Sequence, residues 1–186
     1  SACIYPKYAE QPIKESSMLS GPLEPTNEPY ALAKIVGIKL CETYFKQYSD
    51  NFISVMPNNL YGPNDNFDPD TSHVIPALIK KFHDAKINSS NCVRIWGSGN
   101  PLREFLHVDD LSDAILFIMK NVSVEEIYNQ GISHINVGSG EELSIHELAL
   151  MIKKVVGYKG KINFDKSKPD GTPRKLLDTS IMNKKG

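Results

Sequence analysis

The chain has 186 residues, with 21 lysines and arginines against 22 aspartates and glutamates, so its formal net charge is −1. This balance excludes the strongly charged surfaces with which proteins bind nucleic acids or membranes, and we expect a small molecule or another protein as partner. The three cysteines, Cys3, Cys41 and Cys92, are widely spaced and odd in number, which favours a reducing compartment and gives no metal site. No signal peptide or membrane-spanning run is apparent, so we expect a cytoplasmic location.

The N-terminal part of the chain predicts a strand end, a connection, a helix and a second strand. Residues 1–5 are apolar and precede Pro6, as at the end of a strand, and residues 7–26 have no periodicity, as in an ordered connection. Pro29 favours a helix start, Thr26 or Asn27 can cap it, and helical spacing of apolar residues continues to about Tyr48. Residues 51–56 then predict a strand that ends at Pro57.

Further along, the same criteria predict a series of alternating helices and strands. The turn-rich segment 61–70 predicts a loop, of the kind in which α/β sheets place ligands. Helices are expected at 74–86, at 111–120 with Asp109 or Asp110 as cap, and at 145–157 with a Ser144–Glu147 capping box. Strands are expected at 93–96, 103–108, 134–137 and 161–164, and another helix from Ser180. This alternation predicts parallel βαβ units, that is, an α/β fold.

Tyr30 and Lys34 are four residues apart in the first predicted helix, so their side chains share one face. An ammonium near a phenol favours the phenolate, which prepares the hydroxyl to exchange a proton with an alcohol or ketone. The spacing alone favours the simpler interpretation of a surface tyrosine and a solvated lysine. The pairs Gly97–Gly99 and Gly138–Gly140 lack the third glycine of a dinucleotide fingerprint, and we interpret them as turns.

Several longer blocks together resemble one branch of the extended short-chain dehydrogenase/reductase family, which epimerises and reduces GDP-bound keto sugars. The blocks are residues 1–6, 27–34, 56–67, 72–77, 96–110 and 168–178, and they follow the family order from end to end. The last block and the surroundings of Cys3 and His73 are specific to this branch. The resemblance implies a Rossmann-type parallel sheet with a small mixed α/β substrate domain.

The resemblance also implies a two-step reaction on GDP-4-keto-6-deoxy-D-mannose. The sugar is epimerised at carbons 3 and 5, with Cys3 as base and His73 as acid, the pair being firmer than the individual roles. It is then reduced at carbon 4 by NADPH: Tyr30 donates the proton, Ser1 hydrogen-bonds to the carbonyl oxygen, and Lys34 holds the cofactor ribose. From the residues alone, Cys3 could also be an inert buried thiol and His73 an ordinary loop histidine.

The family pattern also implies binding positions for cofactor and substrate. NADP(H) is expected to contact Tyr30, Lys34, Pro57, Asn58, Asn59, Leu60 and His73. The GDP-sugar is expected to contact Lys81, Trp96, Arg103 and Asp170; Arg103 suits a diphosphate because its guanidinium binds phosphate oxygens in pairs. Trp96 could instead belong to the core, and the role of Lys81 rests on the least support.

The resemblance predicts two domains. Residues 1–60 are expected to be the remaining part of an NADP-binding Rossmann domain, and residues 61–186 mainly a substrate domain with the chain returning to the sheet. The glycine-rich strand, turn and helix that hold the cofactor diphosphate in the family are not among these 186 residues. We therefore expect the 186 residues to be inactive alone. Relatives pair as homodimers through the helix of Tyr30, to which Ile35, Ile38 and Phe45 could contribute.

Two rival interpretations remain open. Another nucleotide-sugar 4-epimerase or 4,6-dehydratase would share Tyr30 and Lys34 but is expected to lack the Cys3 and His73 pair and the 168–178 block. A non-catalytic nucleotide-binding or interaction subunit would not need to keep serine, tyrosine, lysine, cysteine and histidine together.

Overall fold

The computed structural model describes residues 1–185, which form two compact units. Unit 1 comprises Ser1–Leu60, Glu104–Glu141 and the chain from Lys175 onward, and unit 2 comprises Tyr61–Arg103 and Glu142–Arg174. Each unit is therefore assembled from segments that are far apart in the sequence. Three short strands lie where the chain passes from one unit to the other: β2 (Asn59–Tyr61), β4 (Leu102–His107) and β8 (Arg174–Lys175). No helix within residues 1–185 is long and apolar enough to span a bilayer.

Unit 1 contains the helix predicted around Tyr30. This helix, α1 (Glu28–Tyr48), has Pro29 in its first turn and ends where Ser49 adopts a left-handed conformation. Asn27 occupies the N-cap position but makes no side-chain capping bond. Because Ala31, Ile35 and Ile38 recur at helical spacing, they form the buried face of α1.

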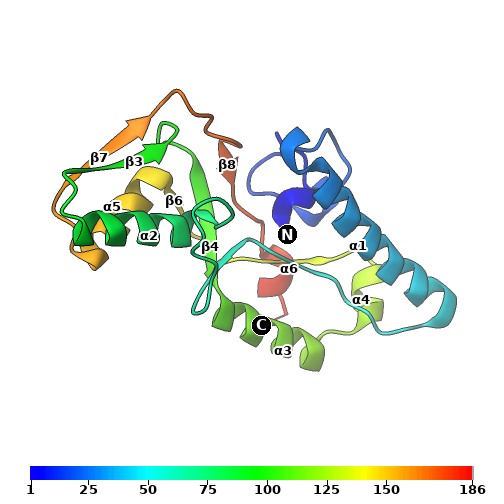
Figure 1. Ribbon diagram of the computed structural model, residues 1–186. Coiled ribbons are helices and arrows are strands. Elements are labelled where there is room, and N and C mark those ends of the chain that lie inside the picture. Colours follow the sequence, from blue (N-terminus) through cyan, green and yellow to red (C-terminus); the bar gives the residue numbers. More distant parts are fainter. Residues whose placement is uncertain (186) are drawn as a thin grey trace. The chain divides into compact units, whose positions relative to one another are not determined.

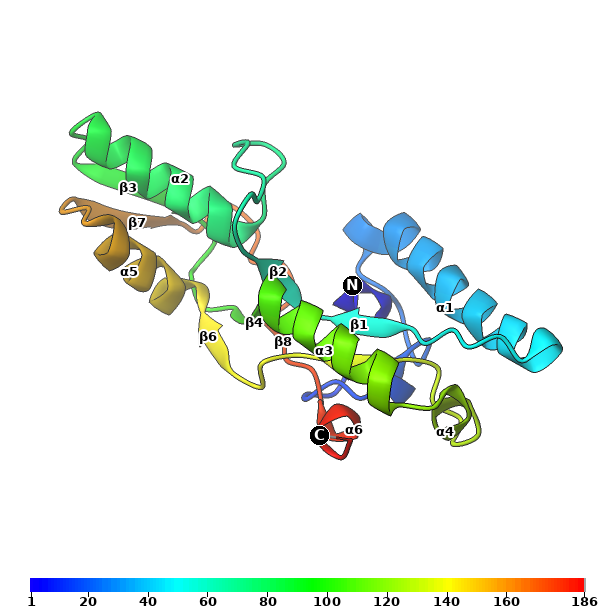
Figure 2. The same ribbon diagram turned by 90° about the horizontal axis from the view of Figure 1, so that it is seen from below.

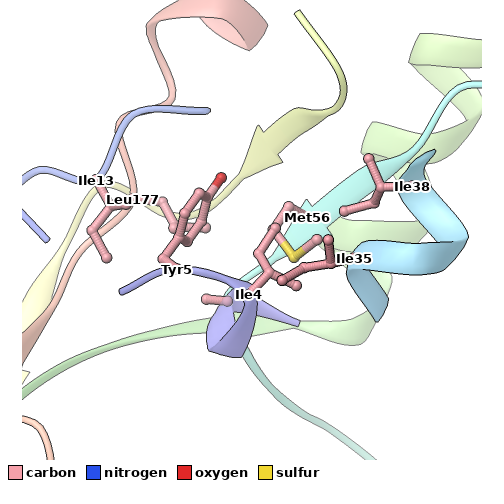
Figure 3. Close-up of a cluster of buried hydrophobic side chains, with 8 residues drawn as sticks. Ile4, Tyr5, Ile13, Ile35, Ile38, Met56 and Leu177 are labelled. Carbon is pink, nitrogen blue, oxygen red and sulfur yellow. The ribbon is translucent and has the colours of Figure 1, made fainter. Parts of the chain in front are cut away.

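The buried face of α1 packs on a core that also includes the N-terminal segment and a strand (Figure 3). Ile35 and Ile38 lie beside Ile4 and Met56, and Ile13 and Leu177 complete the cluster near Tyr5. Met56 belongs to β1 (Val55–Pro57), which pairs in parallel with β5 (Ile135–Val137) so that Met56 lies opposite Asn136. The pairing of β1 with β5 joins the first 60 residues to a strand near residue 136.

The other elements of unit 1 are short, apart from one further helix. They are the 3-10 helices η1 (Ala2–Ile4), η2 (Glu15–Ser17) and η3 (Pro25–Asn27), and the helices α3 (Val108–Asn121), α4 (Val124–Tyr128) and α6 (Ser180–Asn183). A second cluster contains Leu106, Ile118, Val122, Ile127, Ile135 and Val137. Ile135 and Val137 of β5 belong to this cluster, and Asn136 between them forms buried hydrogen bonds. All three residues of β5 are therefore buried.

Unit 2 is built around a parallel pair of strands covered by two helices (Figures 1 and 2). Strand β3 (Cys92–Trp96) pairs with β7 (Lys161–Asp165), with Arg94 opposite Asn163. Helices α2 (Val74–Ile87) and α5 (Ile145–Val156) pack against each other beside the β3–β7 strand pair. Helix α5 follows the short strand β6 (Glu142–Ser144). Phe82 of α2 is fully buried, with its ring 5.7 Å from that of Tyr158.

Three local predictions are wrong, each for a local reason. Residues 2–4 form η1 rather than a strand, because the Ile4 and Tyr5 amides bond back to the carbonyls of Ser1 and Ala2. The strand predicted at 51–56 begins only at Val55, since the Phe52 amide turns back to Asp50. Helix α3 begins at Val108, capped by the ring of His107; Asp109 and Asp110 lie in its first turn, where carboxylates favour the helix dipole.

Candidate active site

The structure brings four of the predicted catalytic residues together in unit 1. Ser1 caps η1 and Cys3 lies within it, and η1 packs against α1, which bears Tyr30 and Lys34. The Lys34 ammonium lies 5.3 Å from the centre of the Tyr30 ring, as their spacing predicts. Tyr30 is 50% exposed, and within residues 1–185 neither its hydroxyl nor the Lys34 ammonium makes a hydrogen bond. Both groups are therefore available to a ligand.

A buried polar network fixes the segment that carries Ser1 and Cys3. The Tyr5 hydroxyl donates to Oδ1 of Asn136 and lies 2.6 Å from Nε2 of His134, while Ser133 Oγ lies 2.8 Å from the other ring nitrogen. Burial lowers the pKa of His134 to about 4, so its ring is neutral near pH 7. The network ties the residue after η1 to β5 and so restricts where Ser1 and Cys3 lie.

Asn136 connects the same network to two further segments. Its side-chain amide donates to the carbonyl oxygens of Ile13, at 2.9 Å, and Asp178, at 3.1 Å. Its backbone amide donates to Glu15 at 3.0 Å, and burial raises the pKa of that carboxyl. The network is satisfied by side chains and backbone groups from four separate stretches of unit 1.

The segment predicted to bind the cofactor, Pro57–Leu60, runs from the last residue of β1 through Asn58 into β2. Asn58 is buried there; its backbone amide donates to Val137 and its side-chain oxygen accepts from the Asn59 amide at 3.0 Å. Its side-chain amide donates to Glu104, a fully buried carboxylate of β4. Glu104 is not among the residues predicted from the sequence, although its alternation with the apolar Leu106 places it on the buried face of a strand.

His73 lies in unit 2, whereas Cys3 lies in unit 1. It is the exposed N-cap residue of α2, and its side chain makes no capping bond; its carbonyl accepts from the Ala77 amide at 2.9 Å. The imidazole is therefore free of the helix end that it precedes. Its pairing with Cys3 stays a prediction.

The four predicted substrate-binding residues all lie in unit 2, along with one that the family pattern does not single out. Trp96, at the end of β3, is 65% exposed and so is not core. The ammonium groups of Lys81 and Lys168 lie 5.5 and 5.6 Å from its ring. An exposed indole bordered by cations can hold a flat ring while its lysines face an anion. Lys168 is the additional residue. Its position at the start of the 168–178 block is the sequence feature that could have identified it as a binding residue.

Asp170 and Arg103 belong to the same part of unit 2. Asp170 accepts from the Ser98 amide at 2.6 Å and its hydroxyl at 2.8 Å, and these bonds, together with nearby Arg103, lower the pKa of its carboxyl. Burial lowers the pKa of Arg103, and Asp170 opposes that shift. Gly97 has φ +82°, and a Cβ atom there would lie 2.3 Å from Asp170 Oδ1, so only glycine fits this turn. Asp170 thus shapes the turn after Trp96.

No cluster of potential metal ligands occurs within the described chain, residues 1–185. The chemistry available to these residues is proton transfer by a phenol, a thiol and an imidazole, together with anion binding by lysine and arginine. Such groups suit acid–base reactions beside a carbonyl.

Residues 1–138 match the model of the NAD dependent epimerase/dehydratase family. Among curated proteins, the probable GDP-L-fucose synthase 1 of Oryza sativa subsp. japonica is 59% identical over 186 residues, covering 100% of this chain and 55% of that relative. The GDP-L-fucose synthase of Escherichia coli (strain K12) is 57% identical over 188 residues, with 100% and 59% covered. The chain thus spans little more than half the length of these relatives.

Solved structures give the same result. A GDP-6-OMe-4-keto-L-xylo-heptose reductase from C. jejuni superposes with a TM-score of 0.93 at 36% identity, covering 100% of this chain and 62% of that one. A GDP-L-fucose synthetase from Naegleria fowleri bound to NADP gives 0.89 at 32% identity, with 98% and 57% covered. The fold is therefore that of the short-chain dehydrogenase/reductase epimerases, an α/β fold with part of a parallel sheet.

Proposed function

The chain belongs to the NAD dependent epimerase/dehydratase family, and from this premise we propose that it forms the catalytic and substrate-binding part of a GDP-L-fucose synthase. Such an enzyme converts GDP-4-keto-6-deoxy-D-mannose to GDP-L-fucose with NADPH. The observation that carries the proposal is the meeting of Ser1 and Cys3 on η1 with Tyr30 and Lys34 on α1. The similarity to named GDP-L-fucose synthases supports the choice of substrate.

Unit 1 has the features needed for the nicotinamide end of NADP(H). The Tyr30 hydroxyl and the Lys34 ammonium have no protein hydrogen bond within residues 1–185. The Pro57–Leu60 segment includes the carboxyl end of the parallel strand β1, the end at which α/β sheets bind ligands. NADPH, when bound, supplies a hydride. We assign Lys34 to the cofactor ribose and Pro57, Asn58, Asn59, Leu60 and His73 to the same cofactor.

In the reduction step, Tyr30 donates a proton to the oxygen of the sugar carbonyl at carbon 4. Ser1 hydrogen-bonds to that oxygen, and its hydroxyl is oriented by the Cys3 amide 3.5 Å away. Fixed donors aimed at a developing negative charge accelerate such reactions most when water is excluded. The same two hydroxyl groups stabilise the enolate oxygen during epimerisation.

In the epimerisation step, Cys3 removes the proton next to the keto group and His73 supplies one to the opposite face. A hydrogen next to a ketone is acidic because the enolate places charge on the oxygen, so inversion needs only a base and an acid. Cys3 is a free, half-buried thiol and His73 is exposed at the start of α2. Deuterium uptake at sugar carbons 3 and 5 should be lost in Cys3→Ser, whereas His73→Asn should lose the inverted product but keep deuterium exchange through Cys3.

Unit 2 is proposed to hold the GDP portion. Trp96 offers its exposed ring to the base, and Lys81, Lys168 and Arg103 provide positive charge for the diphosphate. Asp170 would act through the turn after Trp96, because its carboxylate is already bonded to Ser98. In this assignment, unit 1 is the remaining part of the NADP-binding domain and unit 2 the substrate domain.

We further infer a cytoplasmic homodimer. The three free cysteines suit a reducing compartment. The exposed side of α1 carries Leu32, Val36 and Leu40, a row that a second copy could cover. Ile35 and Ile38 do not contribute, since both are buried in unit 1, and Phe45 lies 5.0 Å from the ring of Tyr128.

The decisive experiment incubates a complete protein that includes these 186 residues with GDP-4-keto-6-deoxy-D-mannose and NADPH. The expected result is NADPH oxidation coupled to a product with the L-fuco configuration. Oxidation with a product of unchanged configuration at carbons 3 and 5 would indicate a simple 4-reductase. Absence of NADPH oxidation would favour a 4-epimerase, a dehydratase or a non-catalytic subunit, and would reject the proposal.

A further inference from the structure

Glu104 is an acidic residue in the interior of unit 1. It is 0% exposed, and its neighbour on the same face of β4 is the buried Leu106. A buried carboxylate is costly unless hydrogen bonds replace its water. The hydrogen-bond partners of Glu104 therefore indicate its structural role.

Three N–H donors satisfy the carboxylate, and they come from three separate segments. Oε2 accepts from the side-chain amide of Asn58 and from the backbone amide of Leu177 at 3.0 Å. Oε1 accepts from the backbone amide of Gly140 at 2.7 Å. One side chain is thus hydrogen-bonded to Asn58 between β1 and β2, to the loop after β5 and to the segment before α6.

The packing around the carboxylate is close. A Cβ atom at Gly138 would lie 2.3 Å from Oε1 of Glu104, so glycine at this position makes room for the side chain. The turn Gly138–Gly140 resembles an incomplete nucleotide motif in the sequence. In the structure it leaves space for the Glu104 side chain and donates a hydrogen bond to its carboxylate.

Glu104 also sets the orientation of Asn58. With its amide group bonded to Glu104 and, at 3.4 Å, to the carbonyl oxygen of Lys175, Asn58 directs its side-chain oxygen to the Asn59 amide, 3.0 Å away. The backbone amide of Asn58 is in turn bonded to Val137 of β5. The path of the Pro57–Leu60 segment thus depends in part on the Glu104 carboxylate.

We propose that Glu104 is a positioning residue that holds the Pro57–Leu60 segment, between β1 and β2, in place for the nicotinamide end of NADP(H). This inference rests on the proposed function, which assigns that segment to the cofactor. Glu104 acts through Asn58 and does not itself touch the cofactor. A displacement of about 1 Å in a positioned group can cost roughly 10²-fold in rate, which is why such an anchor would matter.

The test is the Glu104→Gln variant of the complete protein, because glutamine has the same shape but only one acceptor oxygen. If that oxygen faces Asn58 and Leu177, its amide group faces the Gly140 amide, donor against donor. Without cofactor, hydrogen exchange at the amides of Asn59, Gly140 and Leu177 should become roughly tenfold faster. Glu141→Gln is the matched control, since Glu141 is an exposed carboxylate next to Gly140.

The kinetic arm separates positioning from mere support of the fold. We expect the KM for NADPH to rise roughly tenfold in Glu104→Gln, while the KM for the GDP-sugar and the deuterium uptake at carbons 3 and 5 change little. A variant with a lower melting temperature but an unchanged KM for NADPH would overturn the proposal. Should Glu104→Gln fail to fold, Glu104→Asp, which keeps the charge but shortens its reach, is judged by the same KM criterion.

Direct titration of NADPH binding distinguishes this inference from the proposed function. If the wild-type protein binds NADPH but reduces no GDP-keto sugar, the proposed function is wrong, and weaker binding by Glu104→Gln still supports the anchor. If the wild-type protein is active and both Glu104 variants bind NADPH as it does, only the anchor is wrong.

Discussion

Tyr30 is the residue on which the proposed reduction depends most directly. It is half exposed, and no hydrogen bond to its hydroxyl occurs within residues 1–185. We predict that Tyr30→Phe lowers the kcat for reduction by about 10²- to 10⁴-fold, the usual contribution of a general acid, and leaves the melting temperature unchanged. Tyr48→Phe, which removes another exposed hydroxyl of α1, is the control. An active Tyr30→Phe enzyme would contradict the assignment.

His134 gives a prediction about pH. Burial lowers its pKa in the folded protein to about 4, below the ordinary value of 6.5, so the unfolded chain binds the proton more readily. Folding stability should therefore fall as the pH drops from about 6.5 towards 4, by at most about 3 kcal/mol from this residue. Urea unfolding at pH 7 and pH 5 should show a smaller pH dependence in His134→Gln than in the wild type. His83→Gln, at an exposed site, serves as control, and equal pH dependence in all three proteins would contradict the prediction.

The sequence predicts the positions of Tyr30 and Lys34 better than it predicts the contacts of the buried Glu104. Tyr30 and Lys34 are recognisable because one helix fixes their spacing, and the structure places them as expected. Glu104 has a local signal, its alternation with Leu106, but its partners Asn58, Gly140 and Leu177 are distant in sequence. Only the tertiary fold brings such groups together, so no local pattern reveals the anchor.

At the level of elements, α5 has the clearest sequence signal for both of its ends. The predicted capping box is confirmed: Ser144 Oγ accepts from the Glu147 amide at 3.1 Å, and Glu147 accepts from the Ser144 amide at 2.8 Å. The helix ends at Gly157, which has φ 73°. Its limits could be predicted because they depend on residues at the two ends of the helix or next to them.

Ser144→Ala should destabilise unit 2 by about 1 kcal/mol, because the capping bond to the first turn is lost. The measurement is the midpoint of denaturant unfolding, with Ser90→Ala as control: Ser90 is exposed, and its side chain makes no hydrogen bond within residues 1–185. An equal midpoint for Ser144→Ala and wild type would show that the cap contributes nothing measurable.

Short elements were harder to predict than α5. Strands β2, β6 and β8 and helix α4 have five residues or fewer and lack a periodic signal of their own. Strand β1 is three residues long because its pairing with β5 extends only from Val55 to Pro57. Its length depends on a partner some 80 residues away, and such a limit cannot be derived from local sequence.

At the level of the molecule, unit 1 combines three stretches of chain and unit 2 combines two. Local patterns predict most of the helices and strands but not which stretches share a core. The parallel pairing of β1 with β5 and the Leu177 contribution to the first core both depend on long-range contacts. The family resemblance adds what the patterns lack, because it relates distant blocks to a single site.

The exposed side of α1 supports a prediction about assembly. Val36 and Leu40 are 57% and 52% exposed, and burying such side chains against a second copy would be favourable. In the complete protein, we predict that the double variant Val36→Glu, Leu40→Glu shifts sedimentation from dimer to monomer. A single twofold-symmetric interface would bring together four carboxylates, two from each copy. Val155→Glu on α5, which changes a residue that is 87% exposed, should leave the dimer intact. A monomeric wild type, or a double variant that stays dimeric, would show that this row of α1 is not the interface.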